Sequence, residues 1–230
     1  MVRNTIEILR QAELFSGLDD EILGLLASHA SERRLARDEI LFIAGDPAVG
    51  FYVIAEGALR AYRSGADGRE QVMHVERAVT TLAEVAVFDG GSYPSTVAAE
   101  EPARVFLIRK DDIISACIRH PALALAAAKL MATRLRKCAE LVESLSLREV
   151  GQRVASLFLA EAISRGVKTD HGTRFAQQLT HSQLAARIGT VREVVTRTIS
   201  RLQSQGLVRV DGKNVTVPDI EALSSYANNE

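Results

Sequence analysis

The chain has 230 residues, of which 47% are hydrophobic and 25% charged, and its formal net charge is −1. This length predicts one large or two modest domains with real cores, and we find neither an apolar run as long as a membrane span nor a basic-then-apolar leader. The two cysteines, Cys117 and Cys138, form no CxxC pair, so we expect no disulfide framework, no zinc or iron–sulfur site, and a cytoplasmic location.

The N-terminal part combines helical and strand-like patterns. Apolar spacing predicts helices over Thr5–Phe15 and Asp19–His29. From Asp38 onward, short β-rich runs alternate with turns rich in Gly, Asp and Pro, as is typical of a sandwich or barrel-like roll. The runs cover residues 39–44, 51–55, 58–63, 70–75, 95–99 and 103–108. We therefore predict that residues 1–118 form a β-roll with helical flanks.

A long helix is predicted from Pro121 to about Leu147, because proline suits a first helical turn and no breaker follows it. Its apolar residues recur at spacings of 4, 3, 4 and 3, as in a two-stranded coiled coil. This seam consists of Met131, Leu135, Cys138, Val142 and Leu145. A helix packed on its own β-roll would need a similar stripe. We favour a homodimer in which residues 119–147 form the dimerisation helix and hinge.

The last segment, residues 148–230, starts with a predicted helix over Glu149–Arg165. A loop over Gly166–Gly172 then leads to a short strand at Thr173–Ala176. Residues 147–230 hold eleven Lys and Arg against eight Asp and Glu, whereas the rest of the chain holds seventeen against twenty-one. A basic C-terminal part beside an acidic N-terminal part fits DNA binding by the former.

Residues 179–208 predict two short helices joined by a tight turn. Thr180 is a good N-cap, Gly189 allows the turn, and Gly206 ends the second helix. The buried faces are formed by apolar residues at helical spacing. These are Leu184 and Ile188 in the first helix and Val195, Ile199 and Leu202 in the second.

The opposite side of the second helix is polar, and we call it the reading face. It consists of Arg192, Glu193, Thr196, Arg197 and Ser200. A guanidinium suits guanine O6 and N7, a carboxylate suits cytosine N4, and hydroxyls suit phosphates. An ordinary helical hairpin could also carry such a solvated face. However, residues 207–217 alternate around Asp211-Gly212 and predict a β-hairpin, which completes a DNA-binding winged helix-turn-helix.

This order of elements resembles the CRP/FNR superfamily of bacterial transcription regulators over nearly the whole chain. The specific marks are the roll glycines Gly45, Gly57 and Gly68, the FGELALL-like segment LAEVAVFDGG around Glu84, and the pattern Arg192-Glu193-xxx-Arg197. The resemblance implies an α+β fold. Its parts would be a jelly roll like that of cyclic-nucleotide-binding domains, a long dimerisation helix and a winged helix-turn-helix.

The resemblance also implies how DNA would be bound. Arg192 and Arg197 would read guanines of a TGTGA-like half-site, and Glu193 would accept a hydrogen bond from a cytosine. Val194 would touch a thymine methyl, while Thr180 and His181 would lie near phosphates. The expected partners are palindromic double-stranded DNA, a second copy of the chain and RNA polymerase, with no membrane.

The expected effector is not cyclic AMP. Members that bind it present an Arg-Ser pair after the FGEL-type motif, and we align Tyr93 and Pro94 with that pair. Ala83 replaces the glycine of the motif, Cys138 begins the pair that meets the purine, and only Glu84, the ribose contact, is retained. A cyclic phosphate without a cation would be poorly compensated. We expect Glu84, Tyr93 and Cys138 to cluster near the junction of roll and helix, as candidates for the effector pocket; the regulator could also act without an effector.

The alternative function is a haem- or thiol-based sensor of gas or redox state, of the nitric-oxide type, with the same DNA module. His29 and His74 are the candidate haem ligands and Cys138 the candidate thiol, although structural histidines and an inert cysteine are the simpler interpretation. Two cysteines cannot hold the iron–sulfur centre of the FNR branch. We therefore expect no cofactor, with haem as the alternative. The sequence shows no nucleophile–base pair, metal triad or phosphate loop, so we expect no enzyme.

Overall fold

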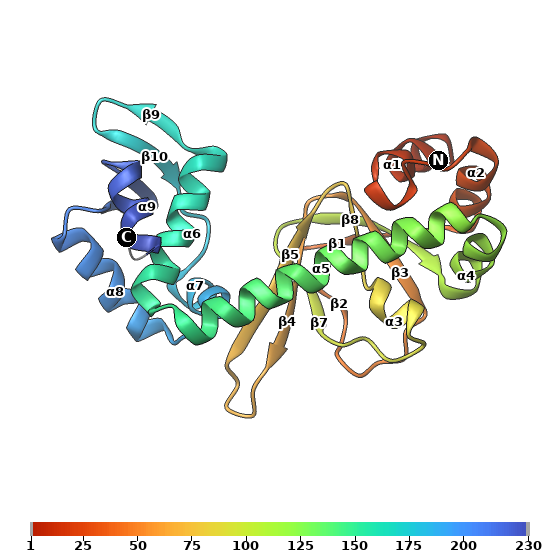
Figure 1. Ribbon diagram of the computed structural model, residues 1–230, viewed down its shortest axis with the longest axis horizontal. Helices are drawn as coiled ribbons and strands as arrows, with labels where there is room; N and C mark the ends of the chain where they lie inside the picture. Colours follow the sequence, from red (N-terminus) through yellow and green to blue (C-terminus); the bar gives the residue numbers. More distant parts are fainter. Residues whose placement is uncertain (1, 229–230) are drawn as a thin grey trace. The chain divides into compact units, whose positions relative to one another are not determined.

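The structure is a computed structural model that describes residues 2–228 (Figure 1). Its contacts divide the chain into two compact units, each described here by itself. The first unit comprises residues 1–63 and 72–138, and the second comprises residues 64–71 and 139–230. The division falls inside the longest helix, so this helix contributes residues to both units.

The chain begins with two α-helices, α1 (Val2–Gln11) and α2 (Asp20–His29), separated by the 3₁₀-helix η1 (Glu13–Phe15). The helix predicted over Thr5–Phe15 is therefore wrong in its last turn, where the chain tightens into η1. Asp19 caps α2, because its carboxylate accepts a hydrogen bond from the Ile22 amide at 3.0 Å.

The β-roll consists of two four-stranded sheets, with strand orders β1-β8-β3-β6 and β2-β7-β4-β5. The strands are β1 (Ser31–Leu35), β2 (Ile40–Phe42), β3 (Gly50–Glu56), β4 (Ala58–Ser64), β5 (Glu70–Arg77), β6 (Thr80–Leu82), β7 (Thr96–Ala99) and β8 (Ala103–Arg109). All six predicted runs are strands. Two strands were not predicted: β1, whose first four residues are exposed, and β6, which has three residues. Short strands without alternation carry little signal.

Two apolar clusters hold the first unit together. One lies inside the roll and includes Ile54, Leu59, Leu82 and Val105. The other joins the roll to α1, α2 and α4 (Lys110–Arg119), and includes the stacked rings of Phe15 and Phe51, whose centroids are 5.9 Å apart. Neither α4 nor the five-residue helix α3 (Glu84–Phe88) was predicted, and α3 is too short to show a helical period.

The long helix α5 (Pro121–Leu147) has the predicted bounds. Leu123 and Ala127 are buried on one side, whereas Leu125, Leu135 and Val142 are 73%, 72% and 62% exposed. Among the described residues, no single helix is long and apolar enough to cross a membrane. The pair of helices α4 and α5 is together long and apolar enough by length and composition, but the two helices are bent by 117° where they meet.

The second unit contains the three predicted helices and a fourth, C-terminal helix that was not predicted, around a small sheet of order β11-β12-β10-β9. Its elements are α6 (Val150–Arg165), β9 (Val167–Thr169), β10 (Gly172–Ala176), α7 (His181–Ile188), α8 (Arg192–Ser204), β11 (Arg209–Asp211), β12 (Asn214–Val217) and α9 (Ile220–Asn228). The predicted loop at Gly166–Gly172 contains β9, which pairs with β10.

The predicted hairpin is confirmed as β11 and β12, but its turn lies one residue later than expected. Asp211 pairs with Asn214, so Gly212 and Lys213 form the turn in place of Asp211 and Gly212. Gly212 has a φ of +58°, which glycine adopts at little cost. This hairpin follows α8 directly and is the wing of the helix-turn-helix.

Candidate nucleic-acid interface and ligand cavity

The ends of α7 are fixed by local hydrogen bonds. The Thr180 hydroxyl accepts from the Gln183 amide at 3.3 Å, and the Gln183 side chain accepts from the Thr180 amide at 2.9 Å. This reciprocal pair is a capping box. At the other end Gly189 has a φ of +71°, and its amide donates to the Ala185 carbonyl. These bonds define where α7 starts and where the chain turns toward α8.

The helix α8 is oriented as its pattern predicts. Val195 and Leu202 are fully buried and Ile199 is nearly so. All five residues of the reading face are exposed, and Val194 is half-buried beside them. Within residues 2–228, no carboxylate lies within ion-pair distance of Arg192 or Arg197, so both guanidinium groups can accept a new partner.

One side-chain contact ties α7 to α8. His181 Nδ1 lies 2.9 Å from Thr196 Oγ1, and the same hydroxyl donates to the Arg192 carbonyl at 3.1 Å. Since a hydroxyl has only one hydrogen, Thr196 accepts from His181 when it donates to Arg192. Ser200 donates in turn to the Thr196 carbonyl at 3.2 Å. These groups therefore position the reading face as well as forming part of it.

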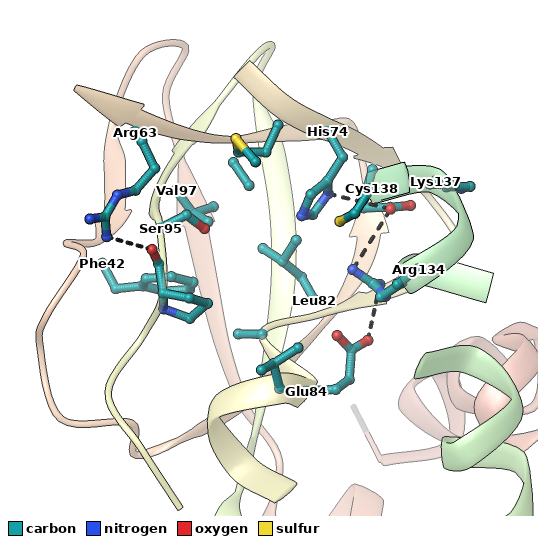
Figure 2. Close-up of a pocket in the computed structure, with 16 residues that line it drawn as sticks. Phe42, Arg63, His74, Leu82, Glu84, Ser95, Val97, Arg134, Lys137 and Cys138 are labelled. Carbon is teal, nitrogen blue, oxygen red and sulfur yellow. Dashed lines mark hydrogen bonds and ion pairs between the residues drawn. The ribbon is translucent and has the colours of Figure 1, made fainter. Parts of the chain in front are cut away.

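The β-roll contains a cavity of about 280 Å³, which we call the roll cavity (Figure 2). Residues from β2, β4, β5, β6, α3, α5, β7 and the turn before β7 surround it. Its apolar wall consists of Phe42, Ala61, Met73, Leu82, Ala83, Val85, Pro94 and Val97. The remaining lining residues are Arg63, His74, Glu76, Glu84, Ser95, Arg134, Lys137 and Cys138.

A buried ion-pair network closes one side of the roll cavity. Arg134 Nη2 donates to Glu84 Oε1 at 3.2 Å and to the Thr81 carbonyl at 2.5 Å, while Arg134 Nη1 lies 3.8 Å from Glu76 Oε1. The side chain of Glu84 is only 1% exposed. Glu84 Oε2 and Arg134 Nε are buried without a hydrogen-bond partner among the described residues. A buried carboxylate oxygen is thus left without a hydrogen-bond partner from the described chain at the cavity wall.

Glu76 is the second carboxylate of this network. Burial raises the pKa of Glu76, but the neighbouring His74 side chain and the positive charges of Arg134 and Lys137 outweigh burial and lower this pKa overall. His74 Nδ1 lies 3.4 Å from Glu76 Oε1. The network therefore favours an ionised Glu76 at neutral pH.

The structure brings Glu84 and Cys138 to the roll cavity but not Tyr93. The Tyr93 ring is buried against Phe42 with centroids 3.8 Å apart, and its hydroxyl donates to the Gly50 carbonyl at 2.9 Å. The chain leaves the turn before β7 with Pro94 and Ser95 at the cavity wall. The expected placement of Tyr93 is therefore wrong by one or two residues along the chain.

The roll cavity also has cations that were not predicted from the sequence. Arg63 lines it from β4 and donates to the Pro94 carbonyl at 2.7 Å. The expectation that no cation would face a ligand is wrong for this reason. Alternation along β4 could have revealed Arg63, since it lies two residues after Ala61 and therefore on the same side of the strand.

Ala83 departs from the family motif but keeps the backbone shape that a glycine there would have. Its φ is +72°, in the left-handed region that alanine rarely adopts. The turn from β6 into α3 thus forms in spite of the side chain, and it places Glu84 in the first turn of α3.

The remaining candidate ligands for a cofactor do not converge. His29 Nδ1 lies 3.0 Å from Asp112 Oδ1 and does not line the roll cavity. Burial raises the pKa of the Cys117 thiol, whereas Cys138 is exposed. In the described part of the chain, no three His, Cys, Asp or Glu side chains are grouped so that they could hold a metal ion.

One class of transcription regulator combines a roll like that of cyclic-nucleotide-binding domains with a DNA-binding winged helix-turn-helix. Comparison with known proteins supports placing the chain in this class. A family model of the cyclic nucleotide-binding domain matches residues 32–120, and a model of the Crp-like helix-turn-helix domain matches residues 152–226. The chain belongs to the CRP/FNR family of transcription regulators, as the sequence resemblance predicted.

Full-length relatives support this membership. The chain is 26% identical over 221 residues to the CRP-like cAMP-activated global transcriptional regulator of Mycobacterium tuberculosis, covering 96% of this chain and 99% of that protein. It is 28% identical over 219 residues to the cyclic AMP receptor protein of Thermus thermophilus, covering 95% and 98%. The structure of a putative CRP/FNR regulator from Eubacterium rectale has the same fold, with a TM-score of 0.76, 22% identity, and coverage of 94% and 97%.

Proposed function

We propose that the protein is a homodimeric regulator that reads a near-palindromic, TGTGA-like site and that does not respond to cyclic AMP. The observation that carries the DNA-reading part is the exposure of Arg192, Glu193 and Arg197 on α8. Two guanidinium groups can each form bidentate hydrogen bonds to guanine O6 and N7, and the carboxylate can accept from cytosine N4. No other exposed helix face in the helix-turn-helix offers this combination among the described residues.

The other proposed DNA contacts lie around these three. Val194 is placed beside the reading face, where its methyls suit a thymine methyl. Thr180 and His181, at the start of α7, together with Thr196 and Ser200, are proposed to lie near phosphates, where they fix position but do not select bases.

Arg197→Ala tests base reading by fluorescence anisotropy on a TGTGA palindrome and on random DNA. We expect a loss of about 1–3 kcal/mol on the palindrome, relaxed selection at one base pair, and little change on random DNA. Arg165→Ala is the matched control, because Arg165 is an exposed arginine at the far end of α6 that pairs with Glu161. Equal losses on both DNAs would reduce Arg197 to a phosphate contact.

The homodimer is supported by the α5 seam. Leu135, Cys138 and Val142 are exposed, while Met131 and Leu145 are half-buried. A row of exposed apolar residues at coiled-coil spacing needs a cover, and a second copy of the helix supplies one with the same spacing. Half-sites about one helical turn apart would follow from the two-fold symmetry.

Leu135→Asp tests the dimer by light scattering. We expect monomers with little specific DNA binding, because two carboxylates would face each other in the seam. Arg136→Asp is the matched control, since this exposed neighbour lies outside the seam. A wild-type monomer at micromolar concentration would refute the proposed assembly.

The exclusion of cyclic AMP is supported by the distribution of charge around the roll cavity, although both relatives described above are named for this nucleotide. The fused ring of a cyclic nucleotide keeps the ribose hydroxyl and the cyclic phosphate close together. If the ribose hydroxyl were bonded to Glu84, the phosphate would need a cation near the Glu84 carboxylate. Arg134 is near, but it already faces Glu84 and Glu76. Arg63 lies across the cavity from Glu84 (Figure 2).

We expect that millimolar cyclic AMP leaves the melting temperature unchanged. A ligand present at 100 times its Kd would stabilise the folded protein by about 2.7 kcal/mol, which a melting scan detects. A clear rise in melting temperature would overturn this part of the proposal and leave the DNA-reading part untouched.

The alternative, a thiol- or haem-based sensor, is favoured by one observation: His74 and Cys138 both line the roll cavity. The volume of about 280 Å³ is below the range of about 300–1,000 Å³ that is typical for drug-sized ligands, and haem is larger than most of these. The cavity therefore fits a thiol sensor better than a haem sensor. A Soret absorption band in the purified protein would support haem, and loss of a peroxide response in Cys138→Ser would support the thiol.

A further inference from the structure

We propose that the roll cavity binds a small amphipathic carboxylate with a hydroxyl at its far end. Arg63 and Ser95 would hold the carboxylate, and Glu84 would accept a hydrogen bond from the hydroxyl. This proposal rests on the proposed function only in taking the cavity as the effector site. It names the chemical class of an effector that is not a cyclic nucleotide.

The preference for an anion follows from the charges that line the cavity. Its cations are Arg63, Arg134 and Lys137, against the carboxylates Glu76 and Glu84. Both carboxylates face Arg134, and in the described chain no carboxylate lies within ion-pair distance of Arg63 or Lys137. A guanidinium has five donors, and Arg63 uses one on the Pro94 carbonyl. Its other donors can bind a carboxylate in bidentate geometry.

The position of Arg63 decides which end of a ligand is anionic. Figure 2 shows Arg63 and Ser95 on one side of the cavity, and Glu84 with Arg134 on the other. Ser95 adds a hydroxyl on the same side as Arg63, at a half-buried position. A carboxylate on that side would be neutralised by a cation that has no ionic partner among the residues described.

The middle of the cavity is apolar. Phe42, Leu82 and Val97 are buried within the roll and form its inner wall, and Met73 and Val85 are partly exposed at the cavity. Burying apolar ligand surface against this wall is favourable, whereas a chain of polar groups there would lose hydrogen bonds to water. The ligand that fits has an apolar body between two polar ends.

Glu84 determines the chemistry of the second end. Its Oε2 atom is buried and has no partner in the described chain, while Arg134 holds the other oxygen. An ionised carboxylate only accepts hydrogen bonds, so a group that meets Oε2 must donate one. A buried acceptor without a partner is costly, and a ligand hydroxyl would relieve that cost.

Isothermal titration of the full-length protein with three matched probes tests the proposal. The probes are 8-hydroxyoctanoate, octanoate and 1,8-octanediol, which share one apolar body. We expect 8-hydroxyoctanoate to bind about tenfold more tightly than either probe that lacks one polar end, which corresponds to about 1.4 kcal/mol. Shorter and longer hydroxy acids, with six and ten carbons, test the fit to the cavity.

Arg63→Gln identifies the carboxylate site. Because the Arg63 side chain is exposed, we expect the variant to keep its fold. Its affinity for 8-hydroxyoctanoate should fall about tenfold, to the level of the diol. Arg77→Gln is the control, since Arg77 is an exposed arginine of β5 that pairs with Glu101 outside the cavity. Binding of the diol should be the same in all three proteins.

Three results would overturn the proposal: equal affinity for acid and diol, no binding of any probe at millimolar concentration, or unchanged affinity in Arg63→Gln. Displacement of bound 8-hydroxyoctanoate by cyclic AMP would support the cavity as the site of this acid and would overturn the proposed exclusion of cyclic AMP. None of these results depends on α8. Specific DNA binding and its loss in Arg197→Ala would therefore still test the proposed function separately.

Discussion

Arg134→Met removes the cation at the centre of the roll-cavity network while retaining much of the apolar stem of the side chain. In the wild type, Arg134 faces Glu84 at 3.2 Å and Glu76 at 3.8 Å, and it donates to the Thr81 carbonyl. The exposed fractions of these three charged side chains are 16%, 1% and 11%. The substitution leaves two largely buried carboxylates without the cation that both of them face.

The magnitude follows from these exposures. Removing one partner of a buried ion pair costs about 3–5 kcal/mol, because the remaining charge has lost its solvent and its partner. Arg134 retains some contact with solvent, so we expect the lower end, about 3 kcal/mol. For a chain of 150–250 residues, this corresponds to a fall in melting temperature of roughly 6–12 °C.

Urea denaturation at pH 7 measures this loss. The chain has no tryptophan, and three of its four tyrosines, Tyr52, Tyr62 and Tyr93, lie in the roll, so tyrosine fluorescence mainly reports the unfolding of this unit. Arg77→Met is the control: its pair with Glu101 is about half exposed, and such pairs contribute at most about 1 kcal/mol. The double variant Arg134→Met/Glu84→Gln should recover most of the loss, because the most deeply buried carboxylate is then neutral and Glu76 still has His74 and Lys137 near it.

A loss below about 1 kcal/mol in Arg134→Met would refute this reasoning, because surface ion pairs contribute no more than that. It would mean that water entering the roll cavity solvates the Glu84 carboxylate well enough to replace the arginine. A double variant no more stable than Arg134→Met would place the loss in packing or in the Thr81 hydrogen bond, and not in the uncompensated charge.

Two further predictions concern the same unit. The pKa of Glu76 is lower in the folded protein than its ordinary value of 4.5. Near and below this pH the unfolded chain therefore binds more protons than the folded protein, and stability falls as the pH drops below about 4.5. Glu76→Gln should flatten this part of an acid-denaturation curve, and an unchanged curve would contradict the lowered pKa of Glu76. Ala83→Gly should stabilise the roll by roughly 0.5–1 kcal/mol in urea, because relief of the left-handed alanine exceeds the added entropy of the unfolded chain, and a destabilised variant would show that the alanine methyl packs usefully.

The features that could be predicted from the sequence are those that a short stretch of chain determines. Thr180 and Gly189 fix the two ends of α7 through bonds to residues no more than four positions away. The reading face follows in the same way from the helical period, because its members all belong to one helix. The predicted runs became strands because alternation and Gly-containing turns coincide along them.

The roll cavity could not be predicted in the same way, because it is assembled from distant parts of the chain. Arg63, Glu84 and Arg134 come from a strand, a short helix and the long helix, and only the fold brings them to one cavity. Tyr93 was misplaced for a related reason. A turn with Gly90 and Gly91 precedes β7, and the sequence does not show which residue after such a turn faces inward.

The two proposed activities of the first unit meet on α5. Arg134, Lys137 and Cys138 line the roll cavity, while Leu135 and Cys138 belong to the seam proposed for dimerisation. A ligand bonded to Glu84 would add a partner to the carboxylate that holds Arg134, and would therefore change how this segment of α5 is held against the roll. Since a ligand shifts an equilibrium only through contacts that differ between two states, the Glu84–Arg134 pair is the contact through which an effector in this cavity would act on α5.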